Sequence, residues 1–392
     1  MFPLRNWTFF LLSISWAALS HAEQRTWTNS EGKTIDAELI EVSGENAILK
    51  MGPNNFEVPI ASLSSPDREF IKDWEKSAPT DTAGDSDIQP VWDAEWPKLV
   101  SADVSQDIEV IKEDEDKGEY IYASEHYEFI CDVKLNTSVV RRFSVLFEAT
   151  NQFCRELPLG MVKPFREERH KIHLFETREA YYEKGGPPGS AGVYISRDGE
   201  GDILVPLTSL GVKQVGSNYS VDYDKENTTL SHEITHQITD PEYYAIGSRG
   251  WFTEGLAEYI ASSGYRSGKF NVDDLRALKE KVTAYGENNT GGRALGETII
   301  APDLQEYFMQ PYEDFVANAN LNYGLAALIA YYFFHMDGEG EAKNIKAFLK
   351  GLKEGKKAPE MFEPLLAGRS WDEMEEDIYR GWRSRGVEIK FR

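Results

Sequence analysis

The spacing of apolar residues changes along the chain, and its first part has the short alternating pattern of β-strands. Residues 34–42 alternate between apolar and polar positions, and shorter apolar runs follow at 47–51 and 56–60. A short helix should then begin near Pro66, because proline is favoured at the first helical position. These elements predict a small β domain over residues 23–75.

Residues 75–90 contain Pro, Thr, Ser, Gly and Asp and almost no apolar residue, which is the composition of a flexible linker. The stretch that follows is ambiguous, although Trp92 and Trp96 can dock on the next domain. We therefore predict a linker over residues 76–117 and a second domain over residues 118–392.

The second domain begins with a mixed pattern and ends with a helical one. Two apolar runs flank Asp198-Gly199, which predicts a β-hairpin over residues 193–205. Later the apolar spacing is that of helices, which we expect over residues 271–285, 323–334, 342–352 and 370–383. The expected class is α+β, with a small sheet, a central helix and a helical lobe.

The central helix contains the sequence His-Glu-Ile-Thr-His at residues 232–236. Residues four apart share one face of a helix, so His232 and His236 can bind one metal ion between them. Glu233 lies close enough on the helix to reach a water molecule bound to that metal. The opposite side of the helix is apolar and can pack on a core, through Leu230, Ile234 and Ile238.

A second motif, Trp-Phe-Thr-Glu-Gly-Leu-Ala-Glu-Tyr at residues 251–259, strengthens this interpretation. Glu254 lies 18 residues after His236 and is a third candidate ligand, since catalytic zinc takes three protein ligands and keeps one position open. Glu258 follows one helical turn later and can accept a hydrogen bond from a ligand histidine. The alternative is a pair of helices whose polar side chains are simply solvated.

Together the two motifs resemble the gluzincin metallopeptidases, a superfamily with thermolysin-like and aminopeptidase-type members. The resemblance is strong over residues 225–262 and implies a thermolysin-like domain with one Zn²⁺ per chain. Glu233 would be the general base, and Glu258 would hold a ligand histidine. The implied metal ligands are His232, His236 and Glu254.

The same resemblance bears on how a substrate would bind. Gluzincin aminopeptidases carry Gly-x-Met-Glu-Asn upstream of the site, and this chain has no such stretch, so we expect an endopeptidase. Gluzincins also have an edge strand beside the zinc that pairs with an extended substrate. The hairpin over residues 193–205 is the candidate for that strand, and a plain structural hairpin is the alternative.

Gluzincins often supply a Tyr or His from the helical lobe to stabilise the oxyanion. Tyr323 fits this role best, because it begins an apolar helix from which its side chain can point back to the site. His335 is the rival, but it lies about 18 Å away at the far end of the same helix at 1.5 Å per residue. The alternative for Tyr323 is an ordinary aromatic residue at an interface.

The N-terminal β domain resembles the Sla-homology domain, a small barrel of the Src-homology-3 kind that is found in secreted bacterial proteins. Such domains bind protein partners, although a packing or spacer role is an equal alternative. The formal net charge of −24 disfavours nucleic acid and anionic membranes as partners. Acidic runs such as residues 113–116 are expected on solvated loops.

The first residues have the pattern of a signal peptide. A basic residue, Arg5, precedes an apolar run over residues 7–19, and small residues precede a cleavage position after Ala22. An uncleaved anchor is the alternative, and no later stretch is long and apolar enough to cross a bilayer. We expect a protein exported to the periplasm or the medium, where Cys131 and Cys154 form one disulfide or remain two buried thiols.

The sequence therefore predicts a secreted zinc-dependent endopeptidase that acts on peptides or proteins. The alternative is an exported binding or scaffold protein with a structural or vestigial zinc site, whose function is carried by the N-terminal domain. The intact Glu233 favours the enzyme, because a structural site has no use for a general base beside an open coordination position.

Overall fold

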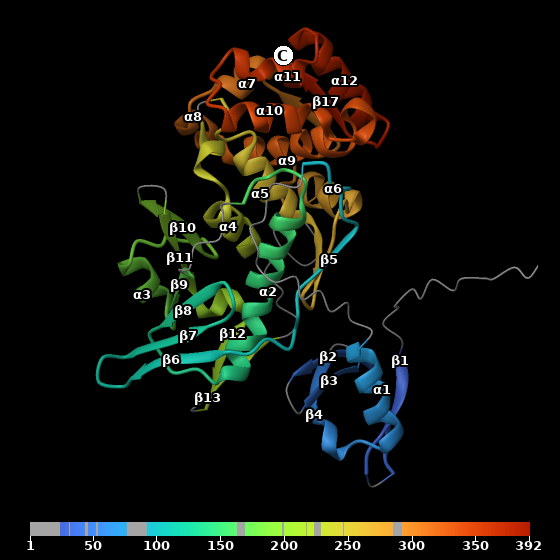
Figure 1. Cartoon of the computed structure of the whole chain (residues 1–392), viewed down its shortest axis with the longest axis vertical. Coiled ribbons are helices and arrows are strands. Elements are labelled where there is room, and N and C mark those ends of the chain that lie inside the picture. The colour runs from blue at the N-terminus through green and yellow to red at the C-terminus, as the bar shows by residue number, and fades with distance from the viewer. Residues whose placement is uncertain are drawn as a thin grey trace, which may run out of the picture. The chain divides into compact units, whose positions relative to one another are not determined.

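The computed structural model describes residues 24–30, 32–43, 46–51, 54–76, 92–162, 169–197, 200–216, 218–222, 229–245, 247–284 and 292–392. The expected signal peptide, most of the polar stretch of the expected linker, and the turn Asp198-Gly199 lie outside the described residues. Helices and strands both contribute to the fold, so the expected α+β class is confirmed. The chain divides after Glu75 into two compact units (Figure 1).

The N-terminal unit is a four-stranded antiparallel sheet with one helix. The strands β1 (Gln24–Thr28), β2 (Thr34–Ser43), β3 (Asn46–Met51) and β4 (Asn54–Pro59) pair in sequence order. The helix α1 (Ser65–Lys76) contributes Ile71 to a core that includes Trp27 and Leu49. Asp67 is buried and accepts hydrogen bonds from Arg25 Nη2 at 2.7 Å and from the Thr28 backbone N–H at 2.8 Å. This carboxylate therefore fastens the start of α1 to β1.

The second unit contains a sheet of six strands. These are β6 (Glu109–Asp114), β7 (Glu119–Ala123), β8 (Tyr127–Cys131), β9 (His170–Phe175), β10 (Val193–Arg197) and β11 (Glu200–Pro206). Their order is β10-β11-β9-β8-β7-β6, with β8, β9 and β11 parallel and the other pairings antiparallel. The predicted hairpin is confirmed as β10–β11, and β10 lies at an edge of this sheet.

Two helices pack beside the sheet, and their packing fixes where the histidine motif lies. α2 (Thr137–Glu156) packs on β8, where Phe147 contacts Phe129 with ring centroids 5.3 Å apart. α4 (Thr229–Ile238), which carries the motif, packs on both α2 and the β10–β11 hairpin. Thr150 of α2 donates a buried hydrogen bond to Ser231 of α4 at 3.1 Å.

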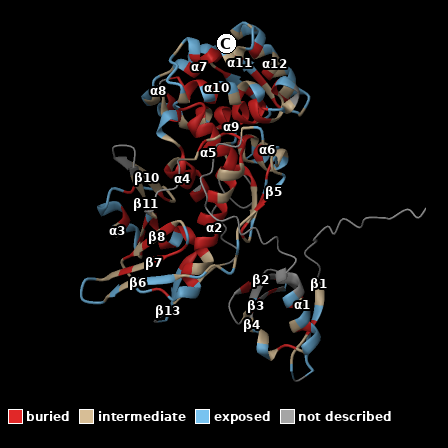
Figure 2. Cartoon of the chain, viewed as in Figure 1, coloured by how far each residue is buried: buried red, intermediate tan, exposed pale blue. Residues whose placement is uncertain are grey.

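The helical lobe is built around α9 (Ala319–His335), which is buried without a break from Gly324 to Phe334 (Figure 2). α5 (Thr253–Ser262) is buried on every side and packs on α9. A Cβ atom on Gly255 would lie 2.6 Å from the Ala326 backbone oxygen, so only glycine allows the two helices to approach this closely. The other helices are α6 (Leu275–Thr283), α7 (Leu304–Met309), α8 (Tyr312–Ala317), α10 (Lys343–Lys353), α11 (Glu363–Leu366) and α12 (Trp371–Arg383).

Short elements complete the second unit. They are β5 (Leu99–Ser101), α3 (Arg178–Glu183), β12 (Val212–Val215), β13 (Asn218–Val221), η3 (Pro241–Tyr244), β14 (Gly264–Arg266), β15 (Lys269–Asn271), β16 (Thr298–Ala301) and β17 (Glu388–Phe391). Within the described part of the chain, no helix has both the length and the apolar character that a bilayer span requires.

Part of the linker predicted over residues 76–117 belongs instead to the second unit. Its last part forms β5, which pairs with β15, and β6, which pairs with β7, so these strands belong to the second unit. Trp96 also packs into this unit, with its ring 5.1 Å from that of Phe334 and its Nε1 donating to the Tyr259 hydroxyl at 3.2 Å. The pairing strands lie more than 100 residues apart for β5 and β15, a distance over which sequence periodicity carries no information.

Other expectations were met or adjusted. The predicted last helix is present, and it begins with a capping box in which Ser370 and Glu373 each accept a hydrogen bond from the backbone N–H of the other. The helix expected over residues 271–285 is shorter, because residues before Leu275 form β15 and a turn. Cys131 and Cys154 are both free and buried, so the alternative of two thiols describes this structure.

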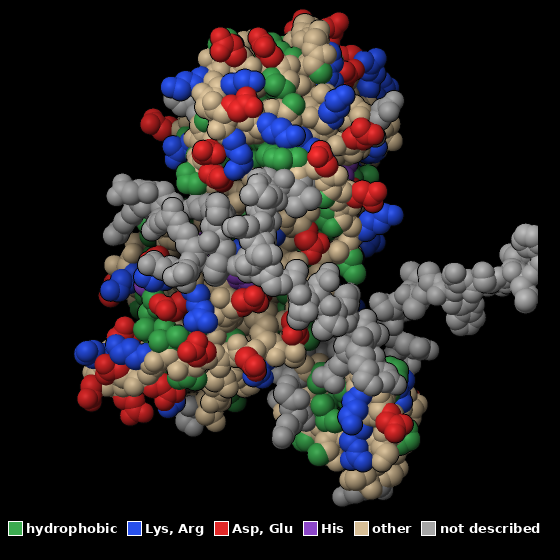
Figure 3. All heavy atoms as spheres, viewed as in Figure 1, with side chains coloured by type: hydrophobic (Ala, Val, Ile, Leu, Met, Phe, Trp, Pro, Cys, Tyr) green, Lys and Arg blue, Asp and Glu red, His purple; other side chains and the backbone are tan. Residues whose placement is uncertain are grey.

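The acidic run at residues 113–116 lies at the end of β6 and in the turn after it, where most of its side chains are exposed. The visible face of the second unit carries acidic and basic side chains interspersed, with acidic residues gathered near this hairpin (Figure 3). The run is therefore a solvated turn, as expected from its composition.

The corrected boundary can be tested with two shortened chains. A chain that begins at Val91 keeps Trp96, β5 and β6, and we expect its second unit to unfold in urea at nearly the same concentration as in the full chain. A chain that begins at residue 118 loses the partly buried Trp96, the buried Val100 and two strands, and should be less stable by roughly 2–5 kcal/mol, the usual effect of removing large apolar side chains from a core. Equal stability of the two chains would support the linker first predicted over residues 76–117.

Candidate metal centre

Two helices bring three predicted ligand atoms to one point. His232 and His236 on α4 and Glu254 on α5 form a buried or half-buried group that could hold a metal ion. The two Nε2 atoms lie 3.0 Å apart, and each lies 3.0 Å from Glu254 Oε2. Ligand atoms on a tetrahedral zinc with bonds of 2.0–2.1 Å lie ~3.3 Å apart, so this cluster needs only a slight expansion to fit the ion.

The local sequence explains why these atoms converge. Leu230, Ile234 and Ile238 are fully buried and fix the rotation of α4, so the histidines four residues apart must face the opposite way. Glu254 is in the first turn of α5, which follows Gly250 with φ of 92°. Glycine adopts this left-handed conformation without strain, and the chain can therefore turn directly into the helix.

The chemistry of the donor set fits a cation. Glu254 is only 3% exposed, and its Oε2 faces two imidazole nitrogens that also face each other. Burial opposes the charge on His232, but hydrogen bonds and charge from Glu254 and Glu258 outweigh it and raise its pKa to about 10. The site thus binds positive charge strongly, and a zinc ion can replace the proton that His232 otherwise carries.

Glu258 has the position that the sequence predicted for it. Its Oε1 lies 3.1 Å from His232 Nδ1 and accepts a hydrogen bond from Arg293 Nη2 at 2.9 Å, and its Oε2 lies 3.5 Å from Lys281 Nζ. Burial alone would raise the pKa of Glu258, but Lys281, His232 and Arg293 lower it well below its usual range. The carboxylate is therefore ionised and holds the His232 ring with its Nε2 towards the cluster.

Two tyrosines that the sequence analysis missed hold the other ligands. The Tyr244 hydroxyl lies 3.2 Å from His236 Nδ1 and donates to the His236 backbone oxygen at 3.1 Å. The Tyr312 hydroxyl donates to Glu254 Oε1 at 2.7 Å. No motif marks either tyrosine, and their distances of 8 and 58 residues from their partners have no helical or strand period.

Glu233 points to the side where the β10–β11 hairpin lies. Its Oε2 accepts a hydrogen bond from the Tyr194 backbone N–H of β10 at 2.9 Å, and its side chain is half-buried. This contact orients one oxygen of the Glu233 carboxylate. The candidate base and the candidate edge strand are therefore neighbours.

Tyr323 lies beside the cluster. Its ring stacks on that of His232 with centroids 5.9 Å apart and planes 18° from parallel, and the Arg293 guanidinium lies 5.0 Å from its centroid. Burial and the charge of Glu254 raise the pKa of Tyr323, so its hydroxyl stays protonated and can donate.

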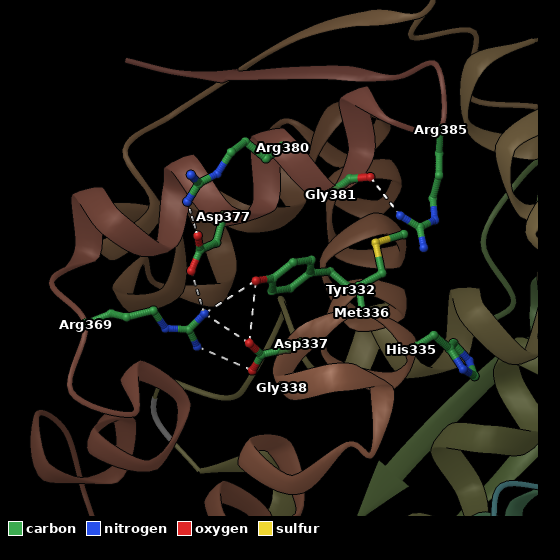
Figure 4. A pocket seen from close by; sticks show the side chains of 10 residues that line it. All are labelled: Tyr332, His335, Met336, Asp337, Gly338, Arg369, Asp377, Arg380, Gly381 and Arg385. Carbon is green, nitrogen blue, oxygen red and sulfur yellow. Dashed lines mark hydrogen bonds and ion pairs between the residues drawn. The ribbon is translucent and has the colours of Figure 1, made fainter.

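His335, the rival to Tyr323, lies elsewhere. Its Nε2 is 3.0 Å from the Tyr259 hydroxyl, and its side chain lines a separate hollow of about 520 Å³ (Figure 4). In that hollow Arg369 forms ion pairs of 3.0 Å with both Asp337 and Asp377. Of the two residues that the sequence offered, the structure therefore brings only Tyr323 to the metal ligands.

Metal binding and catalysis should separate at Glu233. Because Glu233 is not one of the three converging residues, Glu233→Gln should keep about one zinc per chain and lose nearly all peptide hydrolysis. His236→Ala and Glu254→Ala should lose the metal itself. Elemental analysis of the three purified variants measures this directly, and an empty Glu233→Gln protein would show that the ligands are wrongly assigned.

Comparisons with known proteins do not assign a function to this site. No protein-family model matches the chain, and no curated protein matches it either. The candidate metal centre therefore rests on its possible donor set of two imidazoles and one carboxylate, with a polar residue beside each candidate ligand.

Proposed function

We propose that the second unit is a zinc metallopeptidase of the gluzincin type, with a thermolysin-like arrangement of sheet, site helix and helical lobe, and that it cuts peptide bonds internally. The convergence of His232, His236 and Glu254 at 3.0 Å, with Glu233 on the same helix, is the observation that carries this proposal. This set has three ligands and a neighbouring base, whereas structural zinc sites are closed by four protein ligands.

The reaction needs a base that can reach a water molecule and then a leaving group. A zinc ion held by the three ligands supplies a Lewis acid and a water molecule of lowered pKa. Glu233 takes a proton from the water molecule while the oxygen of that water molecule bonds to the scissile carbon. The same carboxyl then gives the proton to the amine nitrogen as the C–N bond breaks. The hydrogen bond from the Tyr194 N–H keeps Glu233 in the orientation that both transfers require.

Tyr323 is the donor proposed for the oxyanion that forms on the carbonyl oxygen. It is held beside His232 by ring stacking and by Arg293, and its raised pKa keeps it protonated at neutral pH. A fixed donor in a partly desolvated site stabilises developing charge without a large reorganisation.

The β10 strand is proposed to pair with an extended substrate. It is the terminal strand of its sheet, and one of its backbone N–H groups contacts Glu233. A peptide laid along such an edge would bring its backbone to the base and the metal ligands. For the N-terminal unit we propose a barrel of the Src-homology-3 kind that binds a protein partner after export.

Internal cleavage of peptides tests the proposed function. We expect zinc-loaded protein to cut N-acetylated peptides as well as free ones, because the sequence lacks the Gly-x-Met-Glu-Asn stretch with which gluzincin aminopeptidases bind a free amine. A chelator should abolish cleavage and added Zn²⁺ should restore it, with mass spectrometry of the products as the measurement. Glu233→Gln protein purified in the same way controls for a contaminating protease.

Two results would contradict this proposal. Stepwise removal of single residues from free N-termini only would replace the endopeptidase with an aminopeptidase. Failure of the zinc-loaded protein to cut any member of a diverse peptide library would remove peptidase activity, and would favour an exported binding protein.

The role of Tyr323 can be measured separately. Tyr323→Phe removes only the hydroxyl, so zinc content and KM should stay close to wild type while kcat falls by about 10²-fold. Tyr332→Phe, which removes a hydroxyl from the same helix in the hollow of Figure 4, is the matched control. If Tyr323→Phe turns over within a few-fold of wild type, another donor serves the oxyanion.

A further inference from the structure

Glu254 uses its two carboxylate oxygens for different partners. Oε2 lies 3.0 Å from the Nε2 atoms of both His232 and His236, whereas Oε1 accepts the hydrogen bond from the Tyr312 hydroxyl at 2.7 Å. A carboxylate can bind zinc through one oxygen or through both. A strong donor on Oε1 would hold that oxygen away from a bound metal ion, and one coordination position would then remain free.

The Tyr312 ring is held on its faces by neighbouring groups. The Arg249 guanidinium lies 4.5 Å from its centroid, and the Phe315 ring stacks on it with planes 5° from parallel and centroids 6.3 Å apart. Gly250 allows this packing, because a Cβ atom there would lie 2.8 Å from Phe315 Cδ2. The hydroxyl direction is therefore set by packing before any metal binds.

The helix α8, which contains Tyr312 and Phe315, also fixes the start of α9. Asn322 Nδ2 donates to the Phe315 backbone oxygen at 2.7 Å, and the Phe315 ring lies 5.3 Å from that of Tyr323. Phe315 therefore packs against both Tyr312 and Tyr323. A displacement of Tyr312 would therefore be felt both at the ligand Glu254 and at the candidate oxyanion donor Tyr323.

We propose that Tyr312 is a positioning residue that keeps Glu254 a one-oxygen zinc ligand and aligns Tyr323 with the metal, an inference that rests on the proposed function. It touches neither the metal nor the substrate. It acts through Glu254, by occupying the second oxygen, and through Tyr323, by packing on the shared neighbour Phe315.

The test compares three single hydroxyl deletions in the full chain. Tyr312→Phe should weaken zinc binding by ~10–100-fold, the usual effect of losing a partner of a metal ligand, as measured by competition with a chromogenic chelator. Tyr323→Phe and Tyr332→Phe should bind zinc within a few-fold of wild type. Thermal unfolding of the metal-free proteins controls for a general loss of structure.

A cobalt spectrum separates positioning from simple destabilisation. With Co²⁺ in place of zinc, the visible bands weaken as the coordination number rises, so a second bound oxygen of Glu254 reduces their intensity. We expect this reduction in Tyr312→Phe and not in Tyr332→Phe.

The other possible outcomes separate the positioning role of Tyr312 from the proposed peptidase function. Wild-type zinc affinity and an unchanged cobalt spectrum in Tyr312→Phe would overturn the positioning role and leave the peptidase proposal intact. A zinc-binding protein without peptidase activity, in which Tyr312→Phe still weakens binding, would overturn only the peptidase. A wild-type chain that binds no zinc would overturn both.

Discussion

Glu254 is a buried carboxylate, and its negative charge must be balanced within the few ångströms around it. The two imidazoles of α4 face one of its oxygens, and the Tyr312 hydroxyl binds the other. An ionised carboxylate without such partners would be very unfavourable in the interior. The positions of α4, α5 and α8 relative to one another are therefore tied to this single side chain.

The helix packing makes that burial possible. α5 is buried on all sides because α4, α6 and α9 pack around it. Gly255 lets the α5 and α9 backbones approach where any side chain would collide with Ala326. The approach brings the start of α9, with Tyr323, to the ring of His232. A small residue next to a ligand thus controls where the candidate oxyanion donor lies.

Charged groups of alternating sign follow one another outward from the candidate metal ligand His232. Glu258 balances His232, and Arg293 and Lys281 balance Glu258 from the segments that follow. Arg293 also covers the Tyr323 ring. Because each group depends on the next, a change at Arg293 would affect both the candidate ligand His232 and Tyr323, although no described contact joins Arg293 to Glu254.

The amino-acid sequence by itself determined the features that depend on local spacing. The four-residue interval of His232 and His236, the buried stripe of α4, the β10–β11 hairpin and the capping box at Ser370 are all set by neighbours along the chain. Only the tertiary structure decided which distant groups meet. Tyr312 reaches Glu254 across 58 residues, Arg293 reaches Glu258 across 35, and Trp96 reaches Tyr259 across 163. Such contacts follow from how helices and strands pack, and no periodicity in the sequence records them.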